Sequence, residues 1–323
     1  METGCFITPS RSLERAIELV SLADSLGYAA CFTTHIAGWE SLTVLAAYAH
    51  ATKEIAIGTG VVPIYTRTPA TMAQTAVTLD ELSGGRLRLG LGVSHQVVVE
   101  NWHGQRIERP VSEMREYVGI VRAILSGEQP PQGSKWRTNF RLVGVDPRPN
   151  LPIYIAALSP NMLRLAGEVG DGVMLWLCVP DYIRDVVVPA VREGRERAGR
   201  SLEGFQVVAA VPAAVVDTAE QKAAVYDALR GELLTYFSLP FYRAMLERAG
   251  FGEEIEAFDR AGGEVEGMKQ AISNRFLDQL TGIGSKAELD TALDRYRQAG
   301  ATLPCVGPAP KGDVEATLRA GAA

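Results

Sequence analysis

Short apolar runs alternate with longer amphipathic segments along most of the chain. Residues 55–62 (IAIGTGVV) form a β-branched apolar run that predicts a buried strand. Residues 69–82 then place apolar side chains at helical spacing, until Ser83-Gly84-Gly85 predicts the end of a helix. Residues 87–93 (LRLGLGV) predict a second buried strand. Two parallel strands joined by a helix form a right-handed crossover unit.

The same strand–helix unit recurs throughout the sequence. Strands that read as continuous apolar runs are buried on both faces, which is compatible with an open doubly wound sheet or a closed barrel. About eight repeats favour the closed TIM (β/α)8 barrel of the α/β class. We expect strands at residues 4–8, 28–33, 55–62, 87–93, 153–158, 172–177, 205–211 and 301–306, and helices at residues 12–26, 42–52, 69–82, 110–125, 159 onward, 181–198 and 286–299.

Two segments interrupt this rhythm. Residues 126–150 contain Pro-Pro and Pro-Arg-Pro sequences and predict an irregular excursion near the rim of the barrel. Residues 219–280 are too long for one crossover and have a mostly helical pattern, so we expect an inserted helical segment after the seventh strand. Both segments are rich in aromatic and aliphatic residues, and we treat residues 1–323 as a single domain.

Composition and charge exclude several classes of function. The net charge of −6 argues against nucleic-acid binding, which needs clustered cations to neutralise phosphates. No apolar run reaches the roughly 18 residues that a membrane-spanning helix requires. The N-terminal sequence shows neither a basic start nor a small-residue cleavage site, so we expect a cytoplasmic protein. The four cysteines, at positions 5, 31, 178 and 305, are too far apart for a CxxC site and predict buried, reduced thiols.

Candidate chemistry lies at the carboxyl ends of the predicted strands, where a barrel places its active site. Thr34-His35 follows the second strand, and Ser94-His95 follows the fourth. A single histidine at such a position is more often structural, but two of only four histidines at one rim favour a functional role. Neither has the acidic neighbours of a metal triad, so we expect no metal site.

Other rim positions fit the binding of an anion and of a planar ring. Ser159-Pro160 begins a helix whose free N–H groups could hold a phosphate, although Ser159 is equally typical of a plain N-cap. The Gly90–Gly92 pair is weak evidence for a dinucleotide, and no acidic residue ends the second strand, which disfavours a Rossmann NAD site. Aromatic residues near the rim could wall a cleft or simply pack: Trp39, Tyr65, Trp102 and Trp176.

The segment GTGVVPIYTRTPATMAQTAVTLDELSGGRLRLGLGVSH strongly resembles the bacterial luciferase-like superfamily. The closest likeness is to the branch that uses the deazaflavin coenzyme F420. Supporting matches are PIYIAALSPNMLRLAGEVGDGVMLW and the late SKAELDTALDRYRQAGATLPCV. The resemblance covers nearly the whole chain and implies a TIM barrel with the cofactor at its carboxyl face. The LSGGR–LGLG element is specific for the superfamily and less specific for the cofactor.

The resemblance also implies roles for individual residues. Thr34-His35 matches the place where deazaflavin enzymes carry Asp-His, which puts His35 near the ring and the substrate and leaves Thr34 in place of the usual acid. Gly60-Val61 matches a non-proline cis peptide whose bulge meets one face of the ring. His95 matches a position often held by a glutamate that donates a proton, so His95 is the first candidate for a proton donor and His35 the second. The cofactor phosphate and its surroundings would be held by Ser94, Ala157, Leu158, Ser159 and Trp176.

The predicted function is an F420-dependent oxidoreductase that transfers a hydride between the deazaflavin C5 and a small organic substrate, with a rim histidine as proton donor or acceptor. Two alternatives stay open. One is an FMN-dependent monooxygenase that uses O2 and reduced flavin from a partner reductase. The other is a non-catalytic flavin-binding protein, to which the loss of the acid at Thr34 would point. Trp39, Tyr65 and Trp102 are the candidates for the substrate pocket, and a homodimer is compatible with the family.

Overall fold

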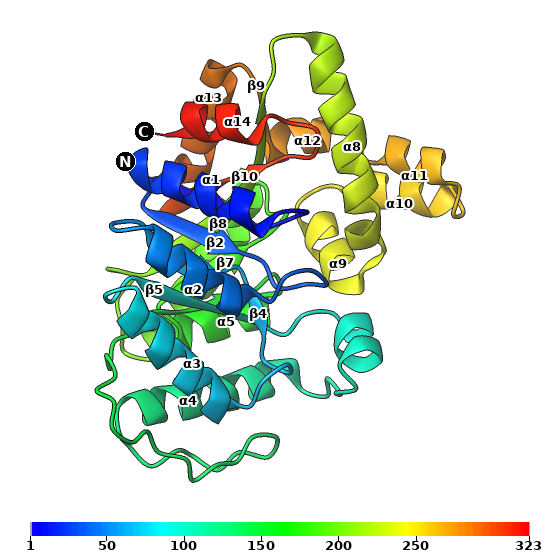
Figure 1. The fold of residues 1–323 in the computed structure, drawn as a ribbon. Helices are drawn as coiled ribbons and strands as arrows, with labels where there is room; N and C mark the ends of the chain where they lie inside the picture. The colour runs from blue at the N-terminus through cyan, green and yellow to red at the C-terminus, as the bar shows by residue number, and fades with distance from the viewer. Residues whose placement is uncertain (1, 323) are drawn as a thin grey trace.

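The computed structural model describes residues 2–322 as a closed parallel barrel surrounded by helices (Figure 1). The strands run in the order β10-β1-β2-β3-β5-β6-β7-β8, and β10 pairs with β8 to close the barrel. Every pairing in the sheet is parallel, so the predicted TIM barrel is confirmed. The strands are β1 (Gly4–Phe6), β2 (Ala30–Thr33), β3 (Ala56–Thr59), β4 (Val62–Pro63), β5 (Leu87–Gly92), β6 (Ile153–Ala156), β7 (Gly172–Leu175), β8 (Gln206–Val215), β9 (Gly282–Gly284) and β10 (Leu303–Pro308).

Most helices begin and end where the sequence predicts. Ser12 caps the first helix by accepting the N–H of Arg15, and prolines at first helical positions begin α3 and α4. The helices around the barrel are α1 (Leu13–Ser25), α2 (Ser41–Ala51), α3 (Pro69–Leu82), α4 (Pro110–Leu125), α5 (Pro160–Val169), α6 (Pro180–Tyr182), α7 (Val188–Arg197), α13 (Lys286–Gln298) and α14 (Val314–Gly321). The predicted helix at residues 181–198 contains a π-helical stretch, η2 (Ile183–Val187), between α6 and α7.

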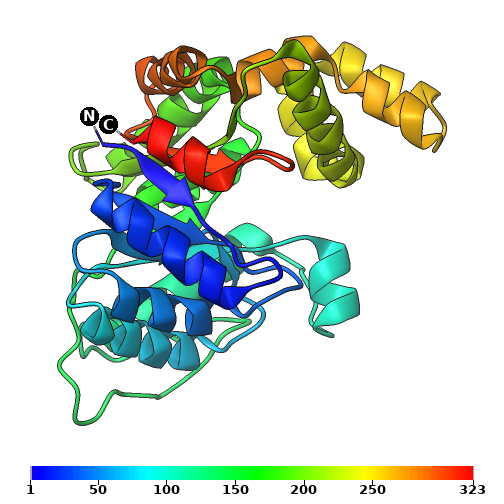
Figure 2. The same cartoon turned by 45° about the horizontal axis from the view of Figure 1, so that its top comes forward.

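The helical insertion after the seventh barrel strand is also present. It stands to one side of the barrel, beyond the carboxyl ends of the strands (Figures 1 and 2). A capping box of Thr218 and Gln221 begins its first helix. Phenylalanines 237, 258, 276 and 251 pack the interior of the insertion, with ring centroids 4.9–5.7 Å apart. The helices are α8 (Ala219–Ser238), α9 (Pro240–Arg248), α10 (Gly252–Arg260), α11 (Val265–Ala271) and α12 (Asn274–Leu280).

Several predicted strands differ in detail from the structure. The strands predicted at residues 4–8, 153–158 and 172–177 each end two residues earlier than expected. The seventh strand does not end at residue 211 but continues to Val215, because its last three residues pair with the unpredicted short strand β9. The sequence 282–284 (GIG) is too short to show a period of its own. The predicted strand at residues 55–62 is two strands, β3 and β4, that share β5 as their partner.

The break between β3 and β4 is a bulge of one residue. Gly58 pairs with Arg88 and Val62 pairs with Leu91, so four steps along one strand oppose three along the other. The Thr59 hydroxyl bridges the gap by donating to the Gly90 carbonyl at 2.7 Å and accepting the Gly90 N–H at 2.9 Å. The Gly60–Val61 peptide within the bulge is cis, as the family resemblance implied.

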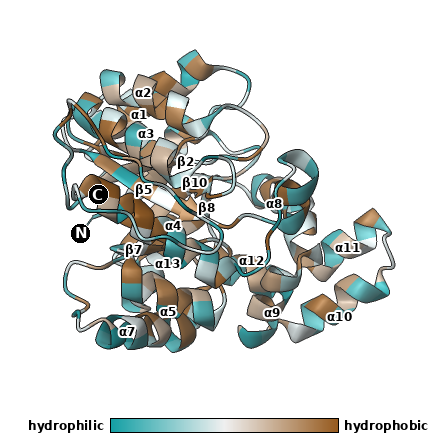
Figure 3. Cartoon of the chain, turned by 90° about the horizontal axis from the view of Figure 1, so that it is seen from below, coloured by the Kyte–Doolittle hydropathy of each residue, from teal (hydrophilic) through white to brown (hydrophobic). Residues whose placement is uncertain are grey.

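Apolar side chains fill two layers, inside the barrel and between the strands and helices. Phe32, Tyr154, Met174 and Val208 belong to the inner cluster, and the larger outer cluster joins the opposite faces of the strands to the helices. In Figure 3 apolar residues are concentrated along the strands and on the helix faces turned toward them. All four cysteines are buried and free, as predicted. Among the described residues, no helix is long and apolar enough to cross a membrane.

Arg86, which ends the LSGGR sequence, ties three elements together at the amino end of the barrel. Its guanidinium donates five hydrogen bonds of 2.6–3.1 Å. The acceptors lie at the end of α2, before β3 and at the end of α3: the carbonyls of Ala49, Thr52, Ile55 and Ser83 and the Thr52 hydroxyl. Gly84 and Gly85 adopt φ values of 66° and 82°, which let the chain turn back so that Arg86 can reach them.

We predict that Arg86→Met lowers the free energy of unfolding by about 3 kcal/mol, because it leaves five acceptors without their donor. The free energy of unfolding of Arg86→Lys should lie between those of Arg86→Met and the natural protein, since an ammonium group cannot reproduce the planar donor geometry of a guanidinium. Chemical denaturation measures both. The matched control is Arg319→Met, which removes an exposed arginine paired with Glu315 and should cost about 0.5 kcal/mol or less. Equal losses for the Arg86→Met and Arg319→Met variants would contradict the assigned role.

Candidate active site

The sequence-predicted residues gather at the carboxyl ends of the barrel strands. Most of them are half-buried, whereas the strand residues before them are largely buried. Half-burial at the open end of a packed barrel is the pattern expected for the walls of a cleft. The half-buried set is Thr34, His35, Gly60, Val61, Ser94, His95, Leu158, Ser159 and Trp176, whereas Ala157 is buried.

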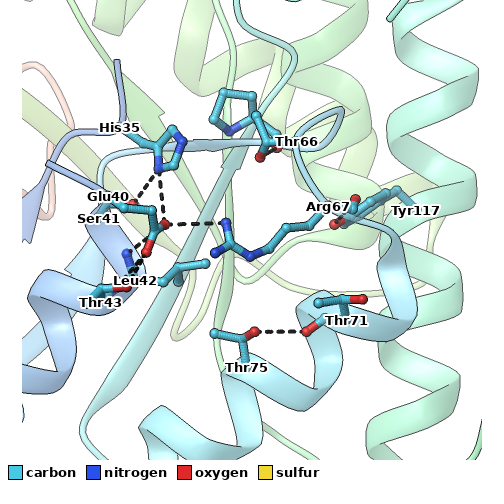
Figure 4. Close-up of polar contacts among 11 residues, drawn as sticks. His35, Glu40, Ser41, Leu42, Thr43, Thr66, Arg67, Thr71, Thr75 and Tyr117 are labelled. Atoms are coloured by element: carbon cyan, nitrogen blue, oxygen red, sulfur yellow. Dashed lines mark hydrogen bonds and ion pairs between the residues drawn. The ribbon is translucent and has the colours of Figure 1, made fainter. Parts of the chain in front are cut away.

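His35 has an acidic partner that sequence reasoning missed. Its Nδ1 lies 3.0 Å from the Ser41 hydroxyl and 3.4 Å from a carboxylate oxygen of Glu40 (Figure 4). Glu40 is the N-cap of α2 and accepts the N–H groups of Leu42 and Thr43 at 3.2 and 2.7 Å. The acid therefore comes from the start of the following helix, five residues after His35.

The Glu40 carboxylate is ionised at neutral pH. Burial would raise the pKa of Glu40, but hydrogen bonds from His35, from the Thr43 hydroxyl and from the helix N–H groups hold that pKa well below its usual range. Arg67 adds a positive charge 3.3 Å from the same carboxylate. An ionised carboxylate can only accept hydrogen bonds, so the contact with Glu40 favours the tautomer with hydrogen on Nδ1, and the Ser41 hydroxyl can accept from the same nitrogen. Nε2 is then the nitrogen left to exchange a proton with a ligand.

The loop that carries His35 is fixed by the loop after β1. The Thr8 hydroxyl accepts the Thr34 N–H at 3.0 Å and lies 3.1 Å from the Thr34 hydroxyl. The Trp39 indole N–H donates to the Ser10 carbonyl at 2.9 Å, which holds the half-exposed ring at the rim. Thr34, where the family resemblance implied an acid, thus has a positioning contact of its own. His35 retains an acidic partner without it.

The bulge between β3 and β4 lies on the strand next to β2, the strand that His35 follows. We call this bulge the floor of the candidate site. A Cβ added to Gly92 would lie 2.5 Å from a methyl of Val61, so only glycine at position 92 leaves room for the bulge. A Cβ added to Gly60 would lie 2.4 Å from the ring of Phe6. Because β3 lies between β2 and β5, this floor is flanked by the strand ends that carry His35 and His95.

His95 lies in an aromatic cluster that the helical insertion supplies. Its ring centroid is 5.7 Å from that of Tyr242 and 6.3 Å from that of Tyr236, and those two tyrosines are 4.9 Å apart. Tyr236 also meets Trp176 at 5.9 Å, so one residue of α8 contacts the ends of two barrel strands. Burial lowers the pKa of His95, which makes the neutral imidazole its form at neutral pH.

The remaining predicted residues divide between the rim and the core. Ser159 caps α5 by accepting the Met162 N–H at 3.4 Å, and its carbonyl accepts the Leu163 N–H at 2.9 Å. Because Pro160 has no N–H, the first turn leaves the Asn161 N–H for an anion. Trp102 is exposed at the end of a π-helix, η1 (Val97–Trp102), that the sequence pattern did not predict. Tyr65 is buried: its hydroxyl donates to Glu113 on α4. The structure therefore packs the Tyr65 side chain against α4, and its place in the substrate pocket stays a prediction.

The chain belongs to the luciferase-like monooxygenase family, whose sequence model matches residues 1–303. A Mycobacterium tuberculosis protein whose assigned activity is that of a coenzyme F420-dependent oxidoreductase is 29% identical over 90% of this chain and 89% of its own. The 5,10-methylenetetrahydromethanopterin reductase of Archaeoglobus fulgidus is 29% identical over 95% of this chain and 93% of its own.

A solved structure shows the same fold over nearly the whole length. The coenzyme F420-dependent tetrahydromethanopterin reductase of Methanopyrus kandleri superposes with a TM-score of 0.80 and 24% sequence identity. The match covers 99% of this chain and 96% of that chain, so the barrel and the helical insertion are both shared.

We predict that Glu40→Gln changes the tautomer of His35, because an uncharged amide no longer fixes hydrogen on Nδ1. The 15N NMR shifts of the imidazole would move from a single Nδ1–H pattern toward a mixture, and Glu40→Asp should restore part of the original pattern. Asp313→Asn is the matched control: it removes the charge of another helix N-cap, on α14, far along the chain from the site. An unchanged His35 spectrum in Glu40→Gln would contradict the pairing.

Proposed function

We propose that the protein is an F420-dependent oxidoreductase that exchanges a hydride with a small organic substrate. The observation that carries the proposal is the pairing of His35 with Glu40 after β2, next to the strand that carries the Gly60–Val61 bulge. It is supported by the family of the chain and by its similarity to a protein named as an F420-dependent oxidoreductase. A planar ring with one polar edge fits this site, because Val61 and Trp176 offer apolar surface while Thr34, His35 and Ser94 offer polar groups.

When bound, F420 supplies or accepts the hydride at its C5, and the protein supplies position and proton transfer. His35 is suited to the proton step, because its contact with Glu40 favours hydrogen on Nδ1 and leaves Nε2 for the exchange with the substrate. In the direction of alcohol oxidation, Nε2 takes the hydroxyl proton while the carbon gives up its hydride. In the direction of carbonyl reduction, the same nitrogen returns the proton.

His95 is better suited to orient the substrate than to donate a proton. Its lowered pKa, caused by burial, leaves little imidazolium at neutral pH. A neutral imidazole among Tyr236, Tyr242 and the end of β5 can still offer one N–H to a substrate oxygen. We therefore propose the reverse of the order expected from the family resemblance, with His35 as the proton-transfer residue and His95 as a hydrogen-bond donor.

Binding of the cofactor phosphate is proposed for the loop after β6. Ala157, Leu158 and Ser159 lead into α5, and the Asn161 N–H of its first turn and the helix dipole favour a negative charge. The Tyr182 hydroxyl holds this loop by donating to the Leu158 carbonyl at 2.7 Å. Trp176 follows β7, the strand next to β6 on the side away from β5.

Parallel titration of the purified protein with F420 and FMN tests the proposed cofactor. We expect F420 to bind at least tenfold more tightly than FMN, measured by fluorescence quenching. The F420-loaded protein should consume no O2, because a reduced deazaflavin does not react readily with oxygen. Tighter FMN binding, with O2 uptake on addition of reduced flavin, would instead identify the monooxygenase and a need for a reductase partner. If neither F420 nor FMN binds, the similarity to the cofactor-dependent relatives extends to the fold alone.

Substitution of the two histidines separates an enzyme from a binding protein. We expect His35→Asn to lower kcat about 100-fold or more with the F420 dissociation constant within a few-fold of the natural value. We expect His95→Asn, which keeps an N–H donor, to lower kcat less than His95→Leu does. His103→Asn, at an exposed histidine, is the control. Unchanged turnover in both the His35→Asn and the His95→Leu variants would rule out this assignment of the site.

A further inference from the structure

The Glu40 carboxylate beside His35 is shared by more donors than it has sites to accept them. Its Oε1 lies 3.4 Å from Nδ1 of His35 and accepts hydrogen bonds from Arg67 at 3.3 Å and from the Leu42 N–H at 3.2 Å. Its Oε2 accepts the N–H and the hydroxyl of Thr43, both at 2.7 Å. A carboxylate has about four lone-pair sites, so the donors compete. The contacts of His35 and Arg67 are the two longest.

Arg67 reaches this carboxylate from the loop between β4 and α3, which follows the floor of the candidate site (Figure 4). The backbone of this loop is held at two points. The Thr66 hydroxyl donates to the Pro63 carbonyl at 2.8 Å, and the Arg67 carbonyl accepts the Tyr117 hydroxyl at 3.0 Å. The Arg67 side chain is only 25% exposed. Its guanidinium is therefore a fixed charge at the site, unlike that of an arginine on the open surface.

No second permanent cation competes with Arg67 for this carboxylate. Within the part of the chain that the structure describes, Glu40 has ion-pair contacts of 4.0 Å or less with Arg67 and His35 alone. Tyr48 on α2 and Tyr65 after β4 are buried, which raises the pKa of each phenol and keeps both uncharged. The remaining titratable groups on the neighbouring loops and on α4 are Arg11, His95, Arg109, Glu113 and Tyr117.

We propose that Arg67 is a positioning residue that limits how strongly His35 holds a proton. A histidine beside an unshared carboxylate is stabilised as imidazolium. Here a proton taken up at Nε2 makes a second cation on an oxygen that already binds a guanidinium, about two hydrogen-bond lengths away. Repulsion between the two cations offsets part of the attraction to Glu40, so His35 can return the proton. The inference rests on the proposed function, in which Nε2 takes a proton in one direction and gives it back in the other.

A pH titration of the histidine NMR signals tests this role without a substrate. The chain has four histidines, and His35→Asn identifies the His35 signal by its absence. We expect Arg67→Met to move the midpoint of the His35 titration upward by about one pH unit, a tenfold gain in proton binding, because a nearby cation is removed. Arg67→Lys keeps the charge and should stay within about 0.3 pH unit of the natural protein. Arg11→Met, which removes an exposed arginine from the β1–α1 loop, is the matched control and should shift the midpoint by less than about 0.3 pH unit.

The sign of the shift separates this role from a merely structural one. If Arg67 only held the loop, its loss would loosen the contact between His35 and Glu40, and the midpoint would fall because the imidazolium would lose its carboxylate. A midpoint that falls or does not move in Arg67→Met would therefore overturn the inference, as would equal shifts in Arg67→Met and Arg11→Met. Arg67→Gln gives the same comparison if Arg67→Met does not fold. Failure of F420 to bind the natural protein would instead overturn the proposed function, so the two failures are distinguishable.

Discussion

The Arg86 guanidinium is the contact on which the first half of the barrel depends. It satisfies carbonyls from the end of α2, from the approach to β3 and from the end of α3, three places where a helix or loop leaves acceptors unpaired. The carboxyl ends of α2 and α3 are thereby held to the starts of β3 and β5. The opposite ends of the same strands, β3 and β5, carry the bulge and His95. The most family-specific sequence of the chain, LSGGR, is thus part of the framework, and the site lies at the other end of the strands.

The site combines two sources of structure that differ in how they are held. His35, the bulge and the Ser94 loop belong to the barrel and are fixed by strand pairing and by caps such as Glu40. Tyr236 and Tyr242 belong to the insertion, which has its own phenylalanine interior. The barrel therefore sets the position of the proposed hydride and proton transfers, and the insertion sets much of the surface that a substrate meets.

Sequence patterns predicted the elements that have strong local signals. The bounds of α3 and α4 match the structure at both ends, because proline begins each and small or polar residues end each. Strand ends were predicted too long in several cases, since the rim residues after β6 and β7 remain apolar. The π-helix η1 and the three-residue strand β9 have no periodic signature. Neither could be found from the sequence.

The candidate site was predictable only where a residue follows a strand. His35 and His95 could be placed in this way, whereas their neighbours could not. Glu40 reads as an ordinary acidic residue before a helix, and its contact with His35 depends on the turn of the intervening loop. Tyr236 lies about 140 positions after His95 in the chain and reaches it only through the fold. Tyr65 shows the converse, because its position after a strand suggested the rim while its side chain packs under α4.

The one-residue bulge between Gly58 and Val62 separates the requirements of folding from those of the site. Strand pairing on either side of it is regular, and a chain with one residue fewer could pair Gly58 with Arg88 and Val62 with Leu91 as before. The extra residue therefore adds nothing that closure of the barrel needs. In evolutionary terms, a barrel with this bulge and a barrel without it are a single codon apart, so the proposed binding surface can be gained or lost while the architecture is inherited intact.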